Sequence, residues 1–142
     1  MVEKGPSPHP LAGEDARRRT WPRAYRLVRR ADYTACYEAG RRFHTEHFLV
    51  FVRYGRGDGP APARLGTAVS RKAGNAVRRN RIKRLLREFF RRHARRFPQG
   101  TDIVVVARKR TGDAALRQAD VDRQLGAVLR RMERRSTGAP PA

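Results

Sequence analysis

Three stretches of the chain repeat apolar residues at the spacing of a helix. The first, residues 30–39, ends before Gly40, which we expect to cap the helix in a left-handed conformation. The second, residues 75–97, stops before Pro98, a residue that cannot continue a helix. In the third, near the C-terminus, apolar residues recur at i, i+4, i+7, i+8 and i+11, which predicts a buried stripe. The stripe consists of Val121, Leu125, Val128, Leu129 and Met132.

The apolar runs between these helices are typical of strands. Residues 48–52 read Phe-Leu-Val-Phe-Val, and residues 64–69 alternate as a second strand should. We expect these two runs to form a hairpin around the Gly- and Pro-rich turn at residues 55–62, with a short strand at residues 41–43 before it. Residues 102–107 are the most apolar short run and predict an interior strand. The order of helices and strands predicts an α+β sandwich.

The second helix is also the most basic part of the chain. Between Ser70 and Phe97, twelve Lys and Arg residues stand against one acid, Glu88, which gives +11 of the formal net charge of +21. Because like charges at i,i+4 destabilise a helix, a face of this kind indicates an anionic partner. At 100° per residue, the basic arc holds Asn80, Lys83, Arg84, Arg87 and Arg91, and the apolar arc holds Ile82, Leu85, Leu86, Phe89 and Phe90.

The composition favours nucleic acid as that partner. The chain has 30 Arg and 4 Lys residues, and the flat guanidinium fork suits phosphate oxygens and base edges. A membrane surface is the rival partner for a basic amphipathic helix, but the apolar residues of this helix are needed to cover a sheet. No apolar run reaches the roughly 18 residues of a membrane span, and the N-terminus lacks the apolar core of a signal peptide. We therefore expect a cytoplasmic protein.

The residues that usually carry catalysis or bind metals are scattered. Cys36 lies in an apolar helical pattern, which favours a small core residue over a nucleophile. His44 and His47 lack the further Cys, His or carboxylate ligands of a metal site. Since no carboxylate cluster would hold the two metals of a protein phosphodiesterase, a self-sufficient nuclease is disfavoured. The sequence predicts no catalytic residue and no metal ligand in the protein.

The two ends of the chain differ from its middle. Residues 1–24 hold four prolines, two glycines and an Arg17-Arg18-Arg19 run, and they cannot bury enough apolar surface to fold alone. We expect a flexible basic arm at residues 1–24, a single RNA-binding α+β domain at residues 25–135 and a disordered tail at residues 136–142.

The run from Lys72 to Arg84, KAGNAVRRNRIKR, closely resembles the signature of the bacterial ribonuclease P protein subunit. The resemblance extends from Tyr25 to Arg108. It implies an α-β-β-β-α-β-α two-layer sandwich with a left-handed βαβ crossover. It also implies a subunit that joins the catalytic RNA of ribonuclease P and assists removal of the 5′ leader of precursor tRNA. The catalytic centre and most of the Mg²⁺ would then belong to the RNA, and the protein alone would not cleave.

The resemblance also assigns roles to particular residues. Bases of the single-stranded leader would lie in a cleft between the first helix and the sheet, where stacking on aromatic rings requires no particular base. The alternative is a basic RNA-binding or ribosome-associated protein of similar fold with no part in processing. The implied catalytic-RNA contacts are Arg78, Arg79, Asn80, Arg81, Lys83, Arg84, Arg87 and Arg91, and the implied leader contacts are Tyr33, Tyr37, Phe51, Lys72, Val105 and Ala107.

Overall fold

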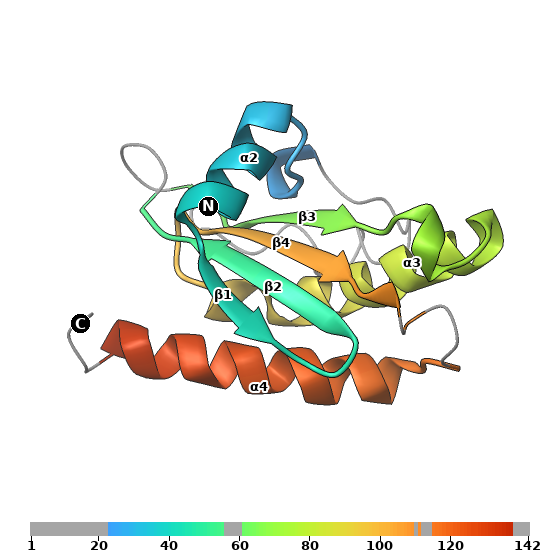
Figure 1. Ribbon diagram of the computed structural model, residues 1–142. Coiled ribbons are helices and arrows are strands. Elements are labelled where there is room, and N and C mark those ends of the chain that lie inside the picture. Colours follow the sequence, from blue (N-terminus) through green and yellow to red (C-terminus); the bar gives the residue numbers. More distant parts are fainter. Residues whose placement is uncertain (1–22, 56–60, 110, 112–114, 138–142) are drawn as a thin grey trace.

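A computed structural model describes residues 23–55, 61–109, 111 and 115–137. One helix covers one face of a four-stranded sheet and two helices cover the other (Figure 1). The elements are η1 (Arg23–Tyr25), α2 (Arg30–Ala39), β1 (Arg41–His44), β2 (Phe48–Arg53), β3 (Arg64–Ala68), η2 (Arg71–Ala73), α3 (Ala76–His93), η3 (Ala94–Arg96), β4 (Asp102–Ala107) and α4 (Gln118–Thr137). The expected α+β class and the order α-β-β-β-α-β-α are confirmed.

The predicted ends of the domain fall mostly outside the described residues. Of the expected basic arm, residues 1–22 lie outside them. The expected tail begins at residue 136, whereas α4 extends as far as Thr137, and the residues beyond it are not described. Among the described helices, none is long and apolar enough to cross a membrane.

The strand order differs from the expected hairpin. The sheet runs β1-β2-β4-β3, with β3 and β4 parallel and the other pairs antiparallel. The predicted pairing of residues 48–52 with residues 64–69 is therefore wrong, because β4 lies between these strands and β2 forms its hairpin with β1. The physical reason is the apolar character of β4, whose buried residues on both faces require a place inside the sheet.

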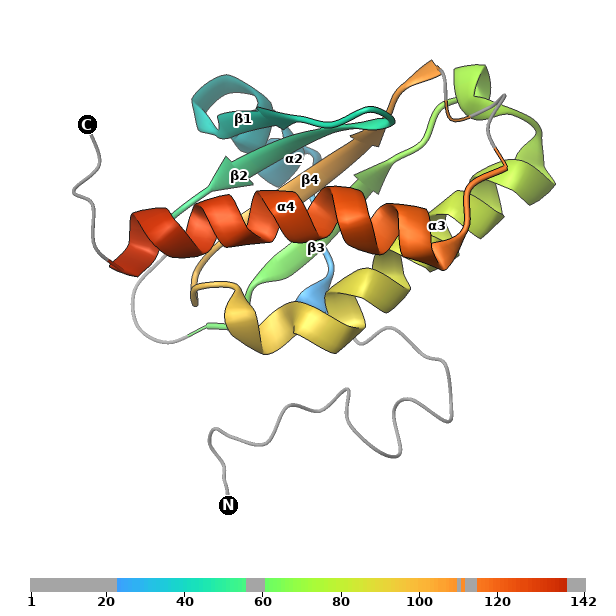
Figure 2. The ribbon, with the colours of Figure 1, turned by 90° about the horizontal axis from the view of Figure 1, so that it is seen from below.

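The main core lies between the sheet and the layer formed by α3 and α4. Figure 2 shows both helices on this face. The whole predicted stripe of α4 is buried here, which confirms it. From α3 the core receives the buried residues Ile82, Leu86, Phe89 and Phe90, with Leu85 packed against them in a partly buried position.

Gly40 ends α2 for a different reason from the one expected. Its φ of −78° and ψ of 154° are extended rather than left-handed. A Cβ atom at this position would lie 2.3 Å from the carbonyl oxygen of Cys36, and the Gly40 N–H donates to that same oxygen at 2.9 Å. Glycine is therefore required by the close approach of two backbone segments.

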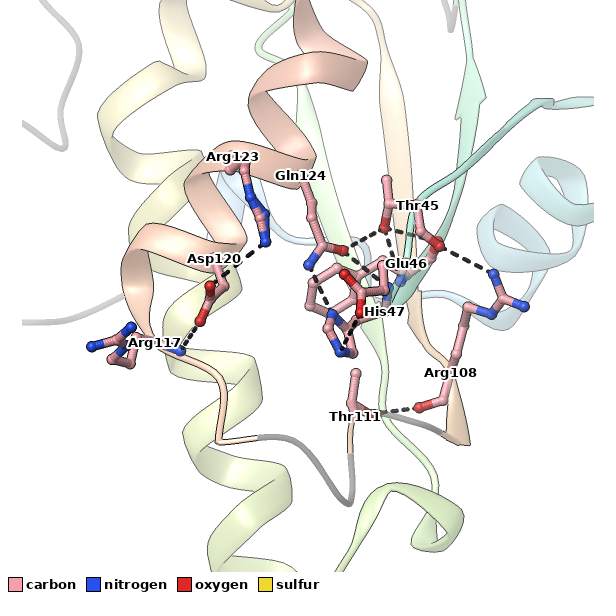
Figure 3. A network of polar contacts seen from close by, with 10 residues as sticks. Thr45, Glu46, His47, Arg108, Thr111, Arg117, Asp120, Arg123 and Gln124 are labelled. Carbon is pink, nitrogen blue, oxygen red and sulfur yellow. Dashed lines mark hydrogen bonds and ion pairs between the residues drawn. The ribbon is translucent and has the colours of Figure 1, made fainter.

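The turn between β1 and β2 is fastened to α4 by one buried side chain (Figure 3). The Oε1 atom of Gln124 accepts hydrogen bonds from Thr45 Oγ1 at 2.8 Å and from the His47 N–H at 3.0 Å. Its Nε2 atom lies 2.8 Å from His47 Nδ1. Because Gln124 is buried, these bonds satisfy polar atoms that water does not reach, and they fix the hairpin against α4.

Candidate nucleic-acid interface

The N-terminal half of α3 presents the basic face that the sequence predicts. Asn75 caps the helix, because its side chain accepts a hydrogen bond from the Arg78 N–H at 2.9 Å. The apolar arc turns into the core, so the basic arc is left toward solvent. Of the predicted contact residues, Arg78, Asn80, Arg81, Arg84 and Arg87 are exposed, and Arg79, Lys83 and Arg91 are partly buried.

These cations differ in whether they form hydrogen bonds or ion pairs within the protein. Within the described part of the chain, Lys83, Arg84 and Arg87 have no hydrogen bond or ion pair. By contrast, the Nε atom of Arg79 donates to the Gly74 carbonyl at 3.2 Å, and Arg81 donates to the Leu116 carbonyl. The first three residues are therefore free to neutralise phosphates, while the other two also hold neighbouring loops.

Arg91 is the least available of the predicted RNA contacts. Its guanidinium forms a fork with Glu88, with Nε–Oε1 and Nη2–Oε2 distances of 3.0 and 2.6 Å. Arg92 also donates to Glu88, and it pairs with Asp122 on α4 at 2.9 Å. The hydrogen bonds from Arg91 are the main reason why the pKa of Glu88 lies below its usual value. The single acid of α3 therefore offsets part of the repulsion expected at the end of the basic arc.

On the opposite face of the sheet, α2 carries the two predicted leader-binding tyrosines. The ring of Tyr33 lies over Gly66 of β3, where a Cβ atom would be 2.8 Å from the ring carbon Cζ. Its hydroxyl donates to the Leu27 carbonyl at 3.5 Å, a long hydrogen bond. Only glycine leaves room for this ring, so Gly66 places Tyr33 against the sheet. Half-buried Tyr33 has one ring face committed to packing.

Tyr37 is the more accessible ring of the pair, with an exposed fraction of 38%. It meets Phe51 edge to face, with ring centroids 5.0 Å apart and planes at 83°. Phe51 is only 7% exposed, and the Arg42 guanidinium lies 5.7 Å above its ring. Phe51 therefore supports Tyr37 from below, while Tyr37 and Arg42 form the outer surface.

Both tyrosines of α2 keep their proton at neutral pH. Burial is the largest effect on both side chains, and it raises the pKa of Tyr33 and of Tyr37. A backbone hydrogen bond with Thr67 and the positive charge of Arg87 act on Tyr33 in the opposite direction. The α2 surface therefore carries two uncharged aromatic rings. The positive charge of Arg87 on α3 acts on the hydroxyl of one of them, Tyr33.

Two of the predicted leader contacts lie on the wrong face of the sheet. Val105 and Ala107 are buried in the core under α3 and α4, whereas Val104 and Val106 belong to the α2 side. Every residue of β4 from Ile103 onward is apolar, so the sequence offers no alternation that would set its register. The α2 side also holds partly buried Leu49 and Ala68, which sequence reasoning missed. Exposed Lys72 lies in η2, between β3 and α3.

A buried ion-pair cluster ties α2 to the sheet. Asp102 is fully buried, and its carboxylate accepts both prongs of Arg64 at 2.9 Å. Arg53 lies 3.8 Å from the same carboxylate. Arg64 also reaches Asp32, in the first turn of α2, at 3.4 Å. Sequence reasoning missed this cluster, although an acid at the start of the most apolar strand was a signal for it.

The structure places the single cysteine of the chain in the core, and the described residues form no metal cluster. Cys36 is fully buried, which confirms it as a core residue. Burial, with Asp102 nearby, raises the pKa of its thiol to about 11, so the thiol is protonated at neutral pH. No group of three His, Cys, Asp or Glu side chains in the described ranges lies close enough to hold a metal ion.

Comparisons with known proteins relate the chain to one protein family. The family model described as Ribonuclease P matches residues 21–133. The ribonuclease P protein component of Desulfovibrio desulfuricans is 55% identical over 123 residues, which cover 87% of this chain and 94% of the relative. The solved ribonuclease P protein of Thermotoga maritima has a TM-score of 0.65 at 37% identity, covering 75% of this chain and 96% of that one. That of Staphylococcus aureus also has a TM-score of 0.65, at 34% identity and with coverages of 75% and 93%. The chain belongs to the family of ribonuclease P protein components.

Proposed function

We propose that α3 docks this ribonuclease P subunit on the catalytic RNA and that the α2 surface holds the 5′ leader of precursor tRNA. The observation that carries the proposal is the division between two surfaces. Lys83, Arg84 and Arg87 offer charge without partners in the described chain, whereas Tyr33 and Tyr37 offer neutral rings. Phosphate neutralisation supplies affinity for a large folded RNA, and ring stacking suits leaders of many sequences.

In this proposal the protein positions the substrate and the RNA performs the chemistry. Hydrolysis of a phosphodiester needs groups that hold Mg²⁺ against the reacting oxygens. Three of the described carboxylates, those of Glu88, Asp102 and Glu133, instead accept hydrogen bonds from arginines, and no three described His, Cys, Asp or Glu side chains are grouped so that they could hold a metal ion. We therefore assign the magnesium ions and the cleavage step to the RNA. We place the protein and the RNA in the cytoplasm.

The direct test is 5′ processing of a precursor tRNA at low magnesium concentration. We expect cleavage when the bacterial catalytic RNA and the protein are combined, because the protein neutralises phosphates that magnesium ions otherwise neutralise. We expect no cleavage by the protein alone. The RNA alone should be much slower under these conditions. A combination no faster than RNA alone at several salt concentrations would favour a general RNA-binding or ribosome-associated role instead.

Replacing Tyr37 with alanine should weaken binding of precursor tRNA by the assembled enzyme. Loss of one stacked base costs about 1–3 kcal/mol, or roughly 5- to 150-fold in affinity. The measurement is the dissociation constant for substrates with leaders of increasing length and for mature tRNA without a leader. Only the substrates with leaders should lose affinity.

Tyr54→Ala is the matched control for this variant. Tyr54 has the same exposed fraction of 38% but lies just beyond the end of β2 at Arg53 and is not part of α2. Tyr33→Phe, which keeps the ring and removes the hydroxyl, should have a small effect. An unchanged dependence on leader length in Tyr37→Ala would refute the assignment of the α2 surface.

A further inference from the structure

A second basic surface lies at the far end of α3 from its capped N-terminus. It is an open groove of about 750 Å³, lined by residues 95–99 on one side and by Arg130, Glu133 and Arg134 of α4 on the other. We name it the η3–α4 groove. The exposed arginines of α4 have no part in the function proposed so far.

One ion pair joins the two walls of the η3–α4 groove. Arg96 of η3 donates to both carboxylate oxygens of Glu133, with Nε–Oε2 and Nη2–Oε1 distances of 2.8 Å each. This fork holds η3 against α4, and it also lowers the pKa of Glu133, so the carboxylate stays ionised at neutral pH. Glu133 is the only acid that lines the groove in the described chain, and its carboxylate is bound by Arg96.

The remaining cations of the groove form no ion pair within the described chain, although the charge of Arg130 acts on Glu133. Arg95, Arg130 and Arg134 are exposed, and none of them has a hydrogen bond or ion pair within the described ranges. The lining thus carries four arginines against one glutamate, a net charge of +3. A concave surface of one sign concentrates counterions, and arginine forks match phosphate oxygens.

We propose that the η3–α4 groove is a second binding site for the sugar-phosphate backbone of the catalytic RNA. This inference rests on the proposed assembly with that RNA. Helices α3 and α4 cover the same face of the sheet, whereas the tyrosines of the leader surface lie on the other (Figures 1 and 2). Arg95 follows Arg84 by eleven positions, roughly 16 Å at 1.5 Å per residue. The groove therefore meets different phosphates from those at Arg84, on the side of the protein that faces the same RNA.

The test removes two charges from the α4 wall. Full-length protein with Arg130→Gln and Arg134→Gln is titrated with the catalytic RNA at several salt concentrations. Because each phosphate contact contributes about 0.9 to the slope of log K against log salt, the slope should become shallower by about 1.8 and affinity near 0.15 M salt should fall roughly thirtyfold. Arg95→Gln, on the opposite wall, should reduce the slope by about half as much.

Arg29→Gln with Arg30→Gln is the matched control, since both residues are exposed cations at the start of α2, on the other face of the sheet, and neither side chain has a partner within the described ranges. An equal loss in this control would overturn the proposal, because it would reflect overall charge. Unchanged binding of the catalytic RNA with weaker binding of precursor tRNA by the assembled enzyme would also overturn it, and would assign the groove to the substrate. If the unmodified protein failed to bind the catalytic RNA, the proposed function itself would fail.

Discussion

Replacing Asp102 with alanine is expected to lower the free energy of unfolding by about 3 kcal/mol, because breaking a buried pair leaves the Arg64 guanidinium with only the more distant Asp32 carboxylate. The Arg64 guanidinium is now held by two hydrogen bonds of 2.9 Å to a carboxylate that is fully buried. These hydrogen bonds raise the pKa of Arg64 in the unmodified protein, and the guanidinium stays charged without them because arginine is not deprotonated in proteins. Urea denaturation followed by circular dichroism measures the loss.

Two further variants separate burial from ion pairing as such. Glu133→Ala removes an equally well-aligned fork with Arg96, but that pair lies at the surface, and the stability should change little. Asp102→Leu combined with Arg64→Met should recover part of the loss, since an apolar replacement leaves no buried charge. A loss for Asp102→Ala no larger than for Glu133→Ala would contradict the role assigned to the cluster.

The Asp102 cluster also links stability to the α2 surface that carries Tyr33 and Tyr37. Arg64 connects Asp102 of β4 to Asp32 in the first turn of α2, and Tyr33 follows Asp32 directly. Because a helix is rigid over ten residues, a shift of its first turn also moves Tyr37. The cluster is therefore a positioning device for both tyrosines, although neither side chain contacts its charges.

The helices and their buried faces were predictable because they depend on local spacing. The stripe from Val121 to Met132 and the two arcs of α3 follow from 3.6 residues per turn, and the structure packs the stripe and the apolar arc into the core as expected. The exposed cations of α3 were predictable for the same reason. A charged residue that shares a helix with a continuous apolar stripe has only the solvent face left.

Strand order and strand register were not predictable, because they depend on partners far apart in the sequence. The uniform apolarity of β4 indicated an interior strand, yet it concealed that Val104, and not Val105, faces α2. The sequence also did not show which cations of α3 form ion pairs within the protein and which are left to bind phosphates. Arg84 and Arg91 both lie one helical turn from Glu88 in the sequence, but only Arg91 forms a fork with its carboxylate.

This difference between the cations of α3 leads to the prediction with the clearest contrast. Replacing Arg84 and Arg87 with glutamine should weaken binding of the catalytic RNA at least thirtyfold near 0.15 M salt, since two lost phosphate contacts reduce the salt slope by about 1.8. Both side chains are exposed and have no partner in the described chain, so the fold should not change. Filter binding across a salt series measures the effect, and thermal melts verify that the variant is folded.

Arg91→Gln is the internal control, because it removes the same charge from the same helix. Its guanidinium is already engaged by Glu88, so phosphate binding there would first have to break a fork within the protein. We expect the salt slope of Arg91→Gln to stay close to that of the unmodified chain. Arg81 is left intact in both variants, since it also donates to the Leu116 carbonyl. If Arg91→Gln weakened binding as much as Arg84→Gln alone, total charge rather than the free cations of α3 would determine affinity for the RNA.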